Sequence, residues 1–497
     1  MAIKLSMKHL DPRPSNMISF PQWMHMSAFV GFFVALGVCS LAFFSYMMEI
    51  RYVVISILSV FIFFVIGSYY SREWAWKKEK TFLKGVFYLG FIVRVLWSSY
   101  LYFFNVYYYG DAFGDGADTT WYMPFAMDIA KALWGFDFAA LPDVFRSYSP
   151  DFDDTGYPIF LGIEYFFIGG ISDVFLPYVI KSALGAYCAV SIYHVAQRHY
   201  GEAVARLSAI FIALNPNLIY WCGTMMKETE MVFLFCLFVD KMDAALNVPK
   251  ITIAAVLPAT LLGMTLFLFR SALGFVAFAA VFLNIVLTSD KVMSLGKKVT
   301  AGVLVSFVVV LGMGDRLLSQ GERIRNAVKT DQQKENMEWR TQRKDASGHQ
   351  NKLITKYATT VVFAPLIFTI PFPTFNQAYS SQILQQILSG GNYIKNILSF
   401  FVILSMFVML LSGDWRRHVF IVAVTCGYLV ALVFSNFAHS GRFHLPIFPM
   451  LMMFGAYGIS LVNGNKNYRR WYIYALGAEV VLCVVWNWFK LAGRGMI

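Results

Sequence analysis

The feature that most constrains this chain is a series of apolar runs, each about as long as a membrane-spanning helix. A helix needs roughly 18 to 20 apolar residues to cross the hydrocarbon core of a bilayer. The sequence therefore predicts an all-α polytopic membrane protein with about thirteen transmembrane helices. We place them near residues 23–47, 52–71, 84–104, 174–196, 207–221, 231–247, 251–269, 271–289, 299–313, 394–412, 418–436, 445–462 and 471–488.

Composition excludes a division of the 497 residues into soluble domains, because 58% of them are hydrophobic and only 14% are charged. A formal net charge of +12 would suggest nucleic acid as the partner of a soluble protein. In a membrane protein, Lys and Arg instead anchor the cytoplasmic loops, so we expect no nucleic-acid partner. The six cysteines lie singly, mostly in apolar runs, and are predicted to be buried rather than paired.

The gaps between the apolar runs alternate in charge, and this alternation predicts the orientation in the membrane. With the N-terminus inside, the basic gaps all fall on one side, which the positive-inside rule identifies as the cytoplasm. They are residues 72–84, 197–206, 240–250, 290–298, 414–418 and 466–470. We therefore expect a multi-pass protein of a bacterial inner membrane, surrounded by membrane lipids, whose active site faces the periplasm.

Two predicted outer loops are long enough to fold. The first, 105–173, is acidic and contains two interrupted apolar segments, 119–136 and 156–170, which we expect to be helices lying in the membrane interface. The second, 314–395, begins with a polar, basic stretch. Its later part, 361–375, contains several prolines, so we expect an interfacial segment rather than a span.

The strongest local motif, GDAFGDGADTTWYMPFA at 110–126, directly follows a predicted span. Its glycines allow tight turns that bring Asp111, Asp115 and Asp118 to the mouth of one cavity. A carboxylate there can accept a proton from a hydroxyl group. The alternative is that these aspartates make turns and face water. The sequence contains neither GxxxxGK[ST] nor a GxGxxG motif after a strand, so we expect no nucleotide cradle of the usual kind.

Four segments, in this order, resemble motifs of the glycosyltransferase-C superfamily, whose members are polytopic enzymes that use polyprenyl-phosphate sugars. Asp118, Tyr122 and Ala126 resemble the family's D-x-x-x-Y-x-x-x-A motif. The other three resemble its P-G-Y-P helix, its A-x-x-P-x-x-x-x-x-S-x-x-x-x-E segment and its R-[YF]-x-x-P-x-x-P element, and are DTGYP (154–158), ALNPNLIYWCGTMMKETE (213–230) and GRFHLP (441–446). Within this superfamily, the chain resembles the protein mannosyltransferase and aminoarabinose transferase group.

The resemblance implies transfer of a sugar, with inversion, from a polyprenyl-phosphate donor to a hydroxyl of a lipid, glycan or protein acceptor. It makes Asp118 the candidate general base, with Asp115 second. Two departures leave open which acid acts and whether a metal takes part: Thr119 stands where many relatives have a second acid, and Asp154-Thr155 where many have His-Pro or Pro-Pro.

Basic residues predicted at the outer ends of different spans are the candidates for binding the donor phosphate: Lys227, Arg270 and Arg442. The alternative is that they only reach toward water and lipid headgroups. Arg94, inside the third predicted span, is either a phosphate contact or an internal partner for Glu164 or an aspartate.

The remaining candidates are assigned to substrate binding: Asp111, Tyr122, Asp154, Tyr157, Glu228, His439 and His444. For Glu228 and Glu230 the favoured alternative is a local pair with Lys227. His439 and His444 lack the same-face spacing of a helical zinc pair. No cofactor is assigned, and a divalent cation held by Asp111, Asp115 or Asp154 stays open.

These assignments divide the chain into four parts: two extra N-terminal helices with a cytoplasmic loop (1–83), a catalytic transmembrane module (84–313), the second outer loop (314–395) and the C-terminal helices (396–497). Two rival functions remain. One is a polysaccharide polymerase or ligase with a polyprenyl-pyrophosphate donor, and the other is a flippase for lipids or glycans.

Overall fold

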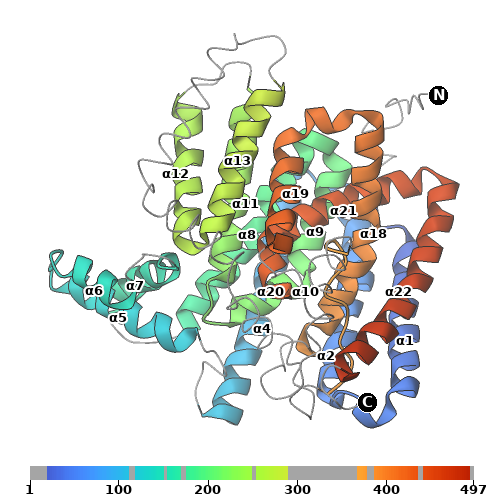
Figure 1. Cartoon of the computed structure of the whole chain (residues 1–497), viewed down its shortest axis with the longest axis horizontal. Coiled ribbons are helices and arrows are strands. Elements are labelled where there is room, and N and C mark those ends of the chain that lie inside the picture. Colours follow the sequence, from blue (N-terminus) through green and yellow to red (C-terminus); the bar gives the residue numbers. More distant parts are fainter. Residues whose placement is uncertain are drawn as a thin grey trace.

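The computed structural model is mainly helical in the part of the chain that it describes. This part comprises residues 19–110, 118–149, 154–169, 175–248, 253–288, 366–377, 386–434 and 440–492. Within these ranges there is no strand, and one isolated bridge joins Met47 to Asn376. The predicted all-α fold class is confirmed for these residues (Figure 1).

The N-terminal part consists of long helices separated by short turns. Before the acidic loop the helices are α1 (Gln22–Ala42), η3 (Phe44–Tyr46), α2 (Ile50–Phe61), the π-helical η4 (Ile62–Ile66), α3 (Gly67–Glu73) and α4 (Glu79–Tyr109). The loop and the segment after it contain α5 (Thr119–Trp134), α6 (Leu141–Tyr148), α7 (Gly156–Ile168), α8 (Phe175–Tyr200), α9 (Glu202–Leu214), α10 (Pro216–Tyr220) and η5 (Trp221–Gly223).

The rest of the described chain is also helical and ends close to the C-terminus. Its elements are α11 (Glu228–Leu246), α12 (Ile253–Phe269), α13 (Ser271–Thr288), α18 (Ser389–Ser412), η7 (Asp414–Arg417), α19 (Val419–Phe434), α20 (Gly441–His444), η8 (Leu445–Ile447), α21 (Phe448–Asn463) and α22 (Lys466–Ala492).

Seven of the described helical stretches are long and apolar enough to cross a membrane, or eight if the bent pair α9 and α10–η5 counts as one span. These long apolar helices are compatible with a multi-pass membrane protein. Each predicted span within the described residues coincides with one or more helical segments. Helices α12, α13 and α19 are shorter than a full span, and α11, at the predicted span 231–247, is not among the seven or eight candidates. The predicted span at 299–313 lies outside the described residues, so the total of about thirteen stays a prediction.

The bend between α9 and α10, 46°, follows directly from the sequence at residues 215 and 216. Proline lacks the amide hydrogen that would continue α9, and it is well suited to begin a new helix. Pro216 is the first residue of α10, and the Asn215 side chain caps α10 by accepting a hydrogen bond from the Leu218 amide at 3.1 Å. The bend directs the following segment across the end of α4, toward the start of α11.

The helices pack as one bundle in which sequence-distant elements are neighbours. Helix α8 contacts α4, α9 and α11, while α18 packs on α21, and α21 also contacts α9. The approach of α18 to α21 is very close at Gly458, where an added Cβ would lie 2.1 Å from the Phe401 carbonyl oxygen. Only glycine fits this crossing. The bundle therefore brings the C-terminal α20–α21 segment against the α8–α11 region.

Helices α5, α6 and α7 form a separate group beside the bundle (Figure 1). The Trp134 indole of α5 donates to the Phe166 carbonyl of α7 at 2.9 Å, and the Tyr148 hydroxyl of α6 donates to Asp128 of α5 at 2.9 Å. The two helices predicted in the acidic loop are confirmed as helices. The short α6 between them was not predicted, because its eight residues contain too few apolar positions to signal a helix.

The second predicted outer loop differs from expectation at residues 366–377, the first of its two described parts. Instead of lying on a surface, this extended segment is buried beside α1, α18 and α22. The Asn487 side chain of α22 accepts a hydrogen bond from the Phe375 amide at 2.8 Å and donates to the Pro373 carbonyl at 3.0 Å. These bonds satisfy backbone groups that a non-helical segment leaves without partners.

Candidate functional site

Arg442 connects three distant parts of the chain through ion pairs at one end of the bundle. Its Nη2 donates to Asp118 Oδ2 at 2.7 Å, and its Nε donates to Glu228 Oε1. Asp118 directly precedes α5, Glu228 is the first residue of α11, and Arg442 lies in α20. Asp118 and Arg442 are 324 residues apart in sequence, so the fold, rather than local structure, creates this contact.

A second ion pair lies beside the first. Lys227, at the N-cap of α11, donates to Asp154 Oδ1. Asp154 has a φ of +58°, in the left-handed region that aspartate tolerates better than most side chains. Burial lowers the pKa of Lys227, and the Asp154 carboxylate opposes this shift. We call Asp118, Asp154, Lys227, Glu228 and Arg442 the charged cluster.

Arg270 approaches the charged cluster from the turn between α12 and α13. It interacts electrostatically with Glu228 and Arg442. Its Nη1 donates to the Tyr428 hydroxyl at 3.0 Å, and its guanidinium lies 4.4 Å from the centre of the Phe443 ring. The Tyr428 hydroxyl in turn donates to the Phe443 carbonyl at 3.0 Å. Three cations and three carboxylates therefore meet at this end of the bundle.

The carboxylates and cations of the cluster differ in their exposure to solvent. The side chains of Asp118 and Asp154 are each 42% exposed, whereas Arg442 is 23% and Lys227 5% exposed. The Glu228 side chain is fully buried. A ligand that approaches from solvent therefore meets the two aspartates first and finds the cations behind them.

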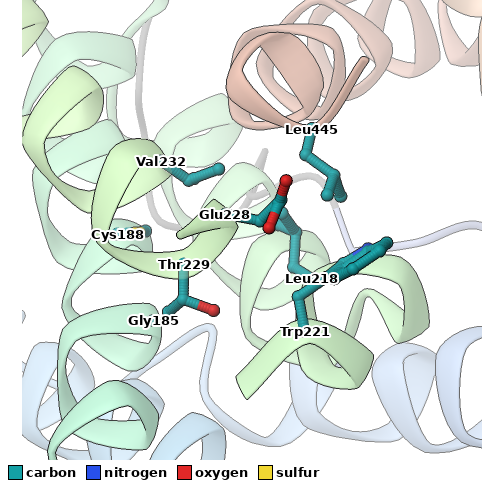
Figure 2. Close-up of a pocket in the computed structure, with 8 residues that line it drawn as sticks. All are labelled: Gly185, Cys188, Leu218, Trp221, Glu228, Thr229, Val232 and Leu445. Carbon is teal, nitrogen blue, oxygen red and sulfur yellow. The ribbon is translucent and has the colours of Figure 1, made fainter. Parts of the chain in front are cut away.

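Glu228 also faces a small pocket beneath Arg442. Figure 2 shows its carboxylate between Trp221 and Leu445. The pocket is mainly apolar and has room for about one water molecule. The Oε2 atom of Glu228 has no hydrogen-bond partner among the described residues, so a water molecule there would satisfy it. The Arg442 guanidinium lies 5.7 Å from the centre of the Trp221 ring, which fixes its orientation from the other side.

Two tyrosines predicted to bind substrate are buried next to the charged cluster and are not part of it. Tyr122 and Tyr157 are buried, with ring centres 5.2 Å apart. The Tyr157 hydroxyl donates to Met225 Sδ at 3.6 Å. Burial, then the carboxylates of Asp154, Glu228 and Asp118, raise the pKa of Tyr122. Tyr122 therefore stays protonated and can act only as a neutral hydrogen-bond partner.

Arg94 lies apart from the charged cluster, and within the described part of the chain it forms no ion pair with Glu164 or an aspartate. Its guanidinium is buried and donates to the carbonyls of Ile212 at 3.0 Å and Ala213 at 2.8 Å. In an unbroken helix the Ile212 carbonyl would bond the amide of residue 216, which is proline here. Arg94 thus replaces the hydrogen bond that Pro216 cannot make, which is a structural role.

We expect Arg94→Met to destabilise the protein without changing its ligand affinity. The substitution leaves the end of α9 without partners for its carbonyls, at a cost of about 3 kcal/mol. Unfolding of the purified protein by denaturant measures this cost. Lys131→Met, which removes an exposed cation on α5, is the control and should change stability by less than about 0.5 kcal/mol. A folded Arg94→Met protein with weakened donor binding would contradict the structural role.

The remaining predicted site residues lie elsewhere or outside the described residues. His444 is buried and turns toward α18, where its Nδ1 lies 3.2 Å from Lys395 Nζ. Asp111, Asp115 and His439 lie outside the described residues. Among the residues that the structure describes, no group of three or more His, Cys, Asp or Glu side chains is arranged to hold a metal ion.

Sequence reasoning missed several residues around the cluster, among them Trp221, Tyr428 and Lys181. Lys181 is buried, and it lies 3.4 Å from Glu230, for which Lys227 had been the expected partner. A single lysine within the apolar run of α8 was the available signal, because such a residue needs a partner inside the protein. No protein-family model matches the chain, and no curated protein matches it significantly.

Proposed function

We propose that this chain is a glycosyltransferase-C enzyme that moves a sugar from a polyprenyl-phosphate carrier to a hydroxyl acceptor on the outer face of the inner membrane. The observation that carries the proposal is the contact between Asp118 and Arg442, which joins the expected base to the expected phosphate ligand. The proposal includes the predicted arrangement of about thirteen spans.

The reaction needs little from the protein beyond placement and charge. The acceptor oxygen attacks the anomeric carbon while the bond from that carbon to the phosphate oxygen breaks. The acceptor proton passes to the Asp118 carboxylate, which is accessible from solvent. Because phosphate is already a good leaving group, cations that neutralise its charge can replace a protonating acid.

The buried cations provide that neutralisation. Arg442 can bind phosphate oxygens in a bidentate manner, and Lys227 and Arg270 lie beside it as further positive charges. In the structure, Arg442 and Lys227 form ion pairs with carboxylates. A bound phosphate would compete with Asp118 and Asp154 for them, which would release Asp118 toward the acceptor. Glu228 is fully buried and would keep Arg442 oriented.

The released carrier distinguishes this function from its nearest rival. We expect purified protein, reconstituted into vesicles with a polyprenyl-phosphate sugar and a hydroxyl acceptor, to release free polyprenyl phosphate. Chromatography of the extracted lipids measures the product. Turnover only with a polyprenyl-pyrophosphate donor would identify a polymerase or ligase instead, and movement of the intact lipid without sugar transfer would identify a flippase.

A further inference from the structure

Three ionisable side chains are buried together next to the charged cluster but outside it. They are Glu164 of α7, Lys181 of α8 and Glu230 of α11. Glu164 is 9%, Glu230 1% and Lys181 0% exposed. Glu230 forms an ion pair with Lys181, and Glu164 interacts electrostatically with both of them. Two carboxylates and one ammonium group therefore share a site with almost no access to water.

Lys181 pairs with one carboxylate and holds the backbone that precedes α11. Its Nζ donates to the carbonyls of Thr224, at 2.8 Å, and Met226, and it lies 3.4 Å from Glu230 Oε2. The ammonium group also lies 4.7 Å from the centre of the Tyr157 ring. Lys181 thus forms an ion pair with Glu230 and interacts electrostatically with Glu164. One ammonium group therefore faces two carboxyl groups.

The carboxylates remain incompletely satisfied. Among the described residues, Glu164 Oε1 and both carboxylate oxygens of Glu230 accept no hydrogen bond of good geometry. An ionised carboxylate in such surroundings is costly unless it is paired, and two nearby carboxylates do not both ionise readily. One added proton would remove the excess negative charge and supply the missing hydrogen-bond donor.

The other groups that face this site do not offer a second positive charge. From α7 they are Tyr157 and Tyr165, from α8 Tyr178, and from α11 Glu228. Helix α12, which also contacts α7, has no ionisable residue in its sequence. Tyr122 of α5 contacts the Tyr157 ring, and the Cys222 thiol of η5 interacts electrostatically with Lys181. Glu228 is held by Arg442 and adds a further negative charge nearby.

We propose that Glu164 and Glu230, together with Lys181, form a proton-binding site that fastens α7 to α8 and α11. The bound proton lets the two carboxyl groups lie together in the protein interior. Because α7 follows directly after Asp154 and contains Tyr157, its attachment also holds one side of the charged cluster in place. The inference concerns protonation and packing, and it does not depend on the reaction proposed above.

The pH dependence that we expect for the attachment of α7 follows from the raised pKa of Glu164. Burial, with the Glu230 carboxylate, raises the pKa of Glu164 from 4.5 to about 8, and Lys181 partly opposes this rise. The state in which α7 is packed on α8 and α11 therefore binds the proton more tightly than a state in which α7 has separated from them. Its extra stability is complete below pH 4.5 and is lost as the pH rises to about 8, by up to about tenfold in the docking equilibrium per pH unit.

Infrared spectroscopy of the protein in lipid tests whether the proton is bound. At about pH 6 we expect a carbonyl band from a protonated carboxyl group that disappears on titration past about pH 8. Glu164→Gln should remove this band, whereas Glu230→Gln, which removes the second cause of the raised Glu164 pKa, should lower the pH at which the band disappears. Glu479 of α22 is a second buried carboxyl group, hydrogen-bonded to Asn396 at 3.0 Å, so Glu479→Gln identifies its separate contribution. A spectrum unchanged in both Glu164→Gln and Glu230→Gln would overturn the proposal.

Hydrogen exchange of the α7 amides tests the consequence for packing. Protection in the wild-type protein, corrected for the intrinsic exchange rate, should fall as the pH rises from 4.5 toward about 8. Glutamine keeps a neutral side chain at every pH, so protection in Glu164→Gln should not change over this range. Should Glu164→Gln fail to fold, Glu230→Gln, which removes the neighbouring charge that helps to raise the Glu164 pKa, should move the loss of protection to lower pH. Wild-type protection that is constant with pH would contradict the proposed site.

Discussion

Asp118→Asn should abolish sugar transfer while leaving the protein folded. Asparagine has almost the same shape, and its side-chain oxygen can still accept the hydrogen bond that Arg442 donates at 2.7 Å. It cannot take up the proton of the acceptor hydroxyl. Loss of a general base lowers the rate by about 10² to 10⁴, so the released carrier should fall below detection in the vesicle assay.

Asp128→Asn is the matched control for this variant. Asp128 lies on the same helix, α5, and is bonded to Lys131 and Tyr148 rather than to the charged cluster. The control removes one carboxylate from α5 and should cost less than about 1 kcal/mol, because these contacts are largely exposed. If Asp118→Asn transferred sugar as fast as Asp128→Asn, Asp118 would not be the base.

The spans could be predicted because a helix that crosses a bilayer needs a minimum number of apolar residues, and these residues can be counted along the sequence. Helices lie at the positions expected for α1, α4 and α18, and the Pro216 break falls within the predicted span at 207–221. The prediction was less successful for residues 366–377. Their prolines indicated an irregular segment, but not that Asn487, more than 100 residues away, would satisfy its backbone inside the bundle.

The members of the charged cluster could be predicted better than their partners. Asp118, Lys227 and Arg442 were candidates because an ionisable residue near the end of an apolar run usually faces a partner or a cavity. Sequence proximity then suggested the wrong pairs. Glu228 is bonded to Arg442 rather than to the adjacent Lys227, and Glu230 lies by Lys181. Such pairs depend on how helices cross in the folded protein, and these crossings cannot be predicted from a single sequence.

Arg442→Ala should have the largest effect on both stability and donor binding. The change leaves the fully buried Glu228 carboxylate without its cation, and breaking a buried ion pair in this way costs about 3 to 5 kcal/mol. It also removes the only cation of the charged cluster that contacts both Asp118 and Glu228 in the described part of the chain. Denaturant unfolding and equilibrium binding of a polyprenyl-phosphate sugar measure the two effects separately.

The double variant Arg442→Ala/Glu228→Gln separates the stability effect from the binding effect. Because glutamine carries no charge, the double variant should recover much of the stability lost in Arg442→Ala, and the double-mutant cycle gives the coupling between the two side chains. Donor affinity should stay low in both, since the phosphate still lacks its bidentate partner. Wild-type donor affinity in the restabilised double variant would show that Arg442 serves the fold alone. The donor phosphate would then have to bind at Lys227, in the same charged cluster, and at Arg270 beside it.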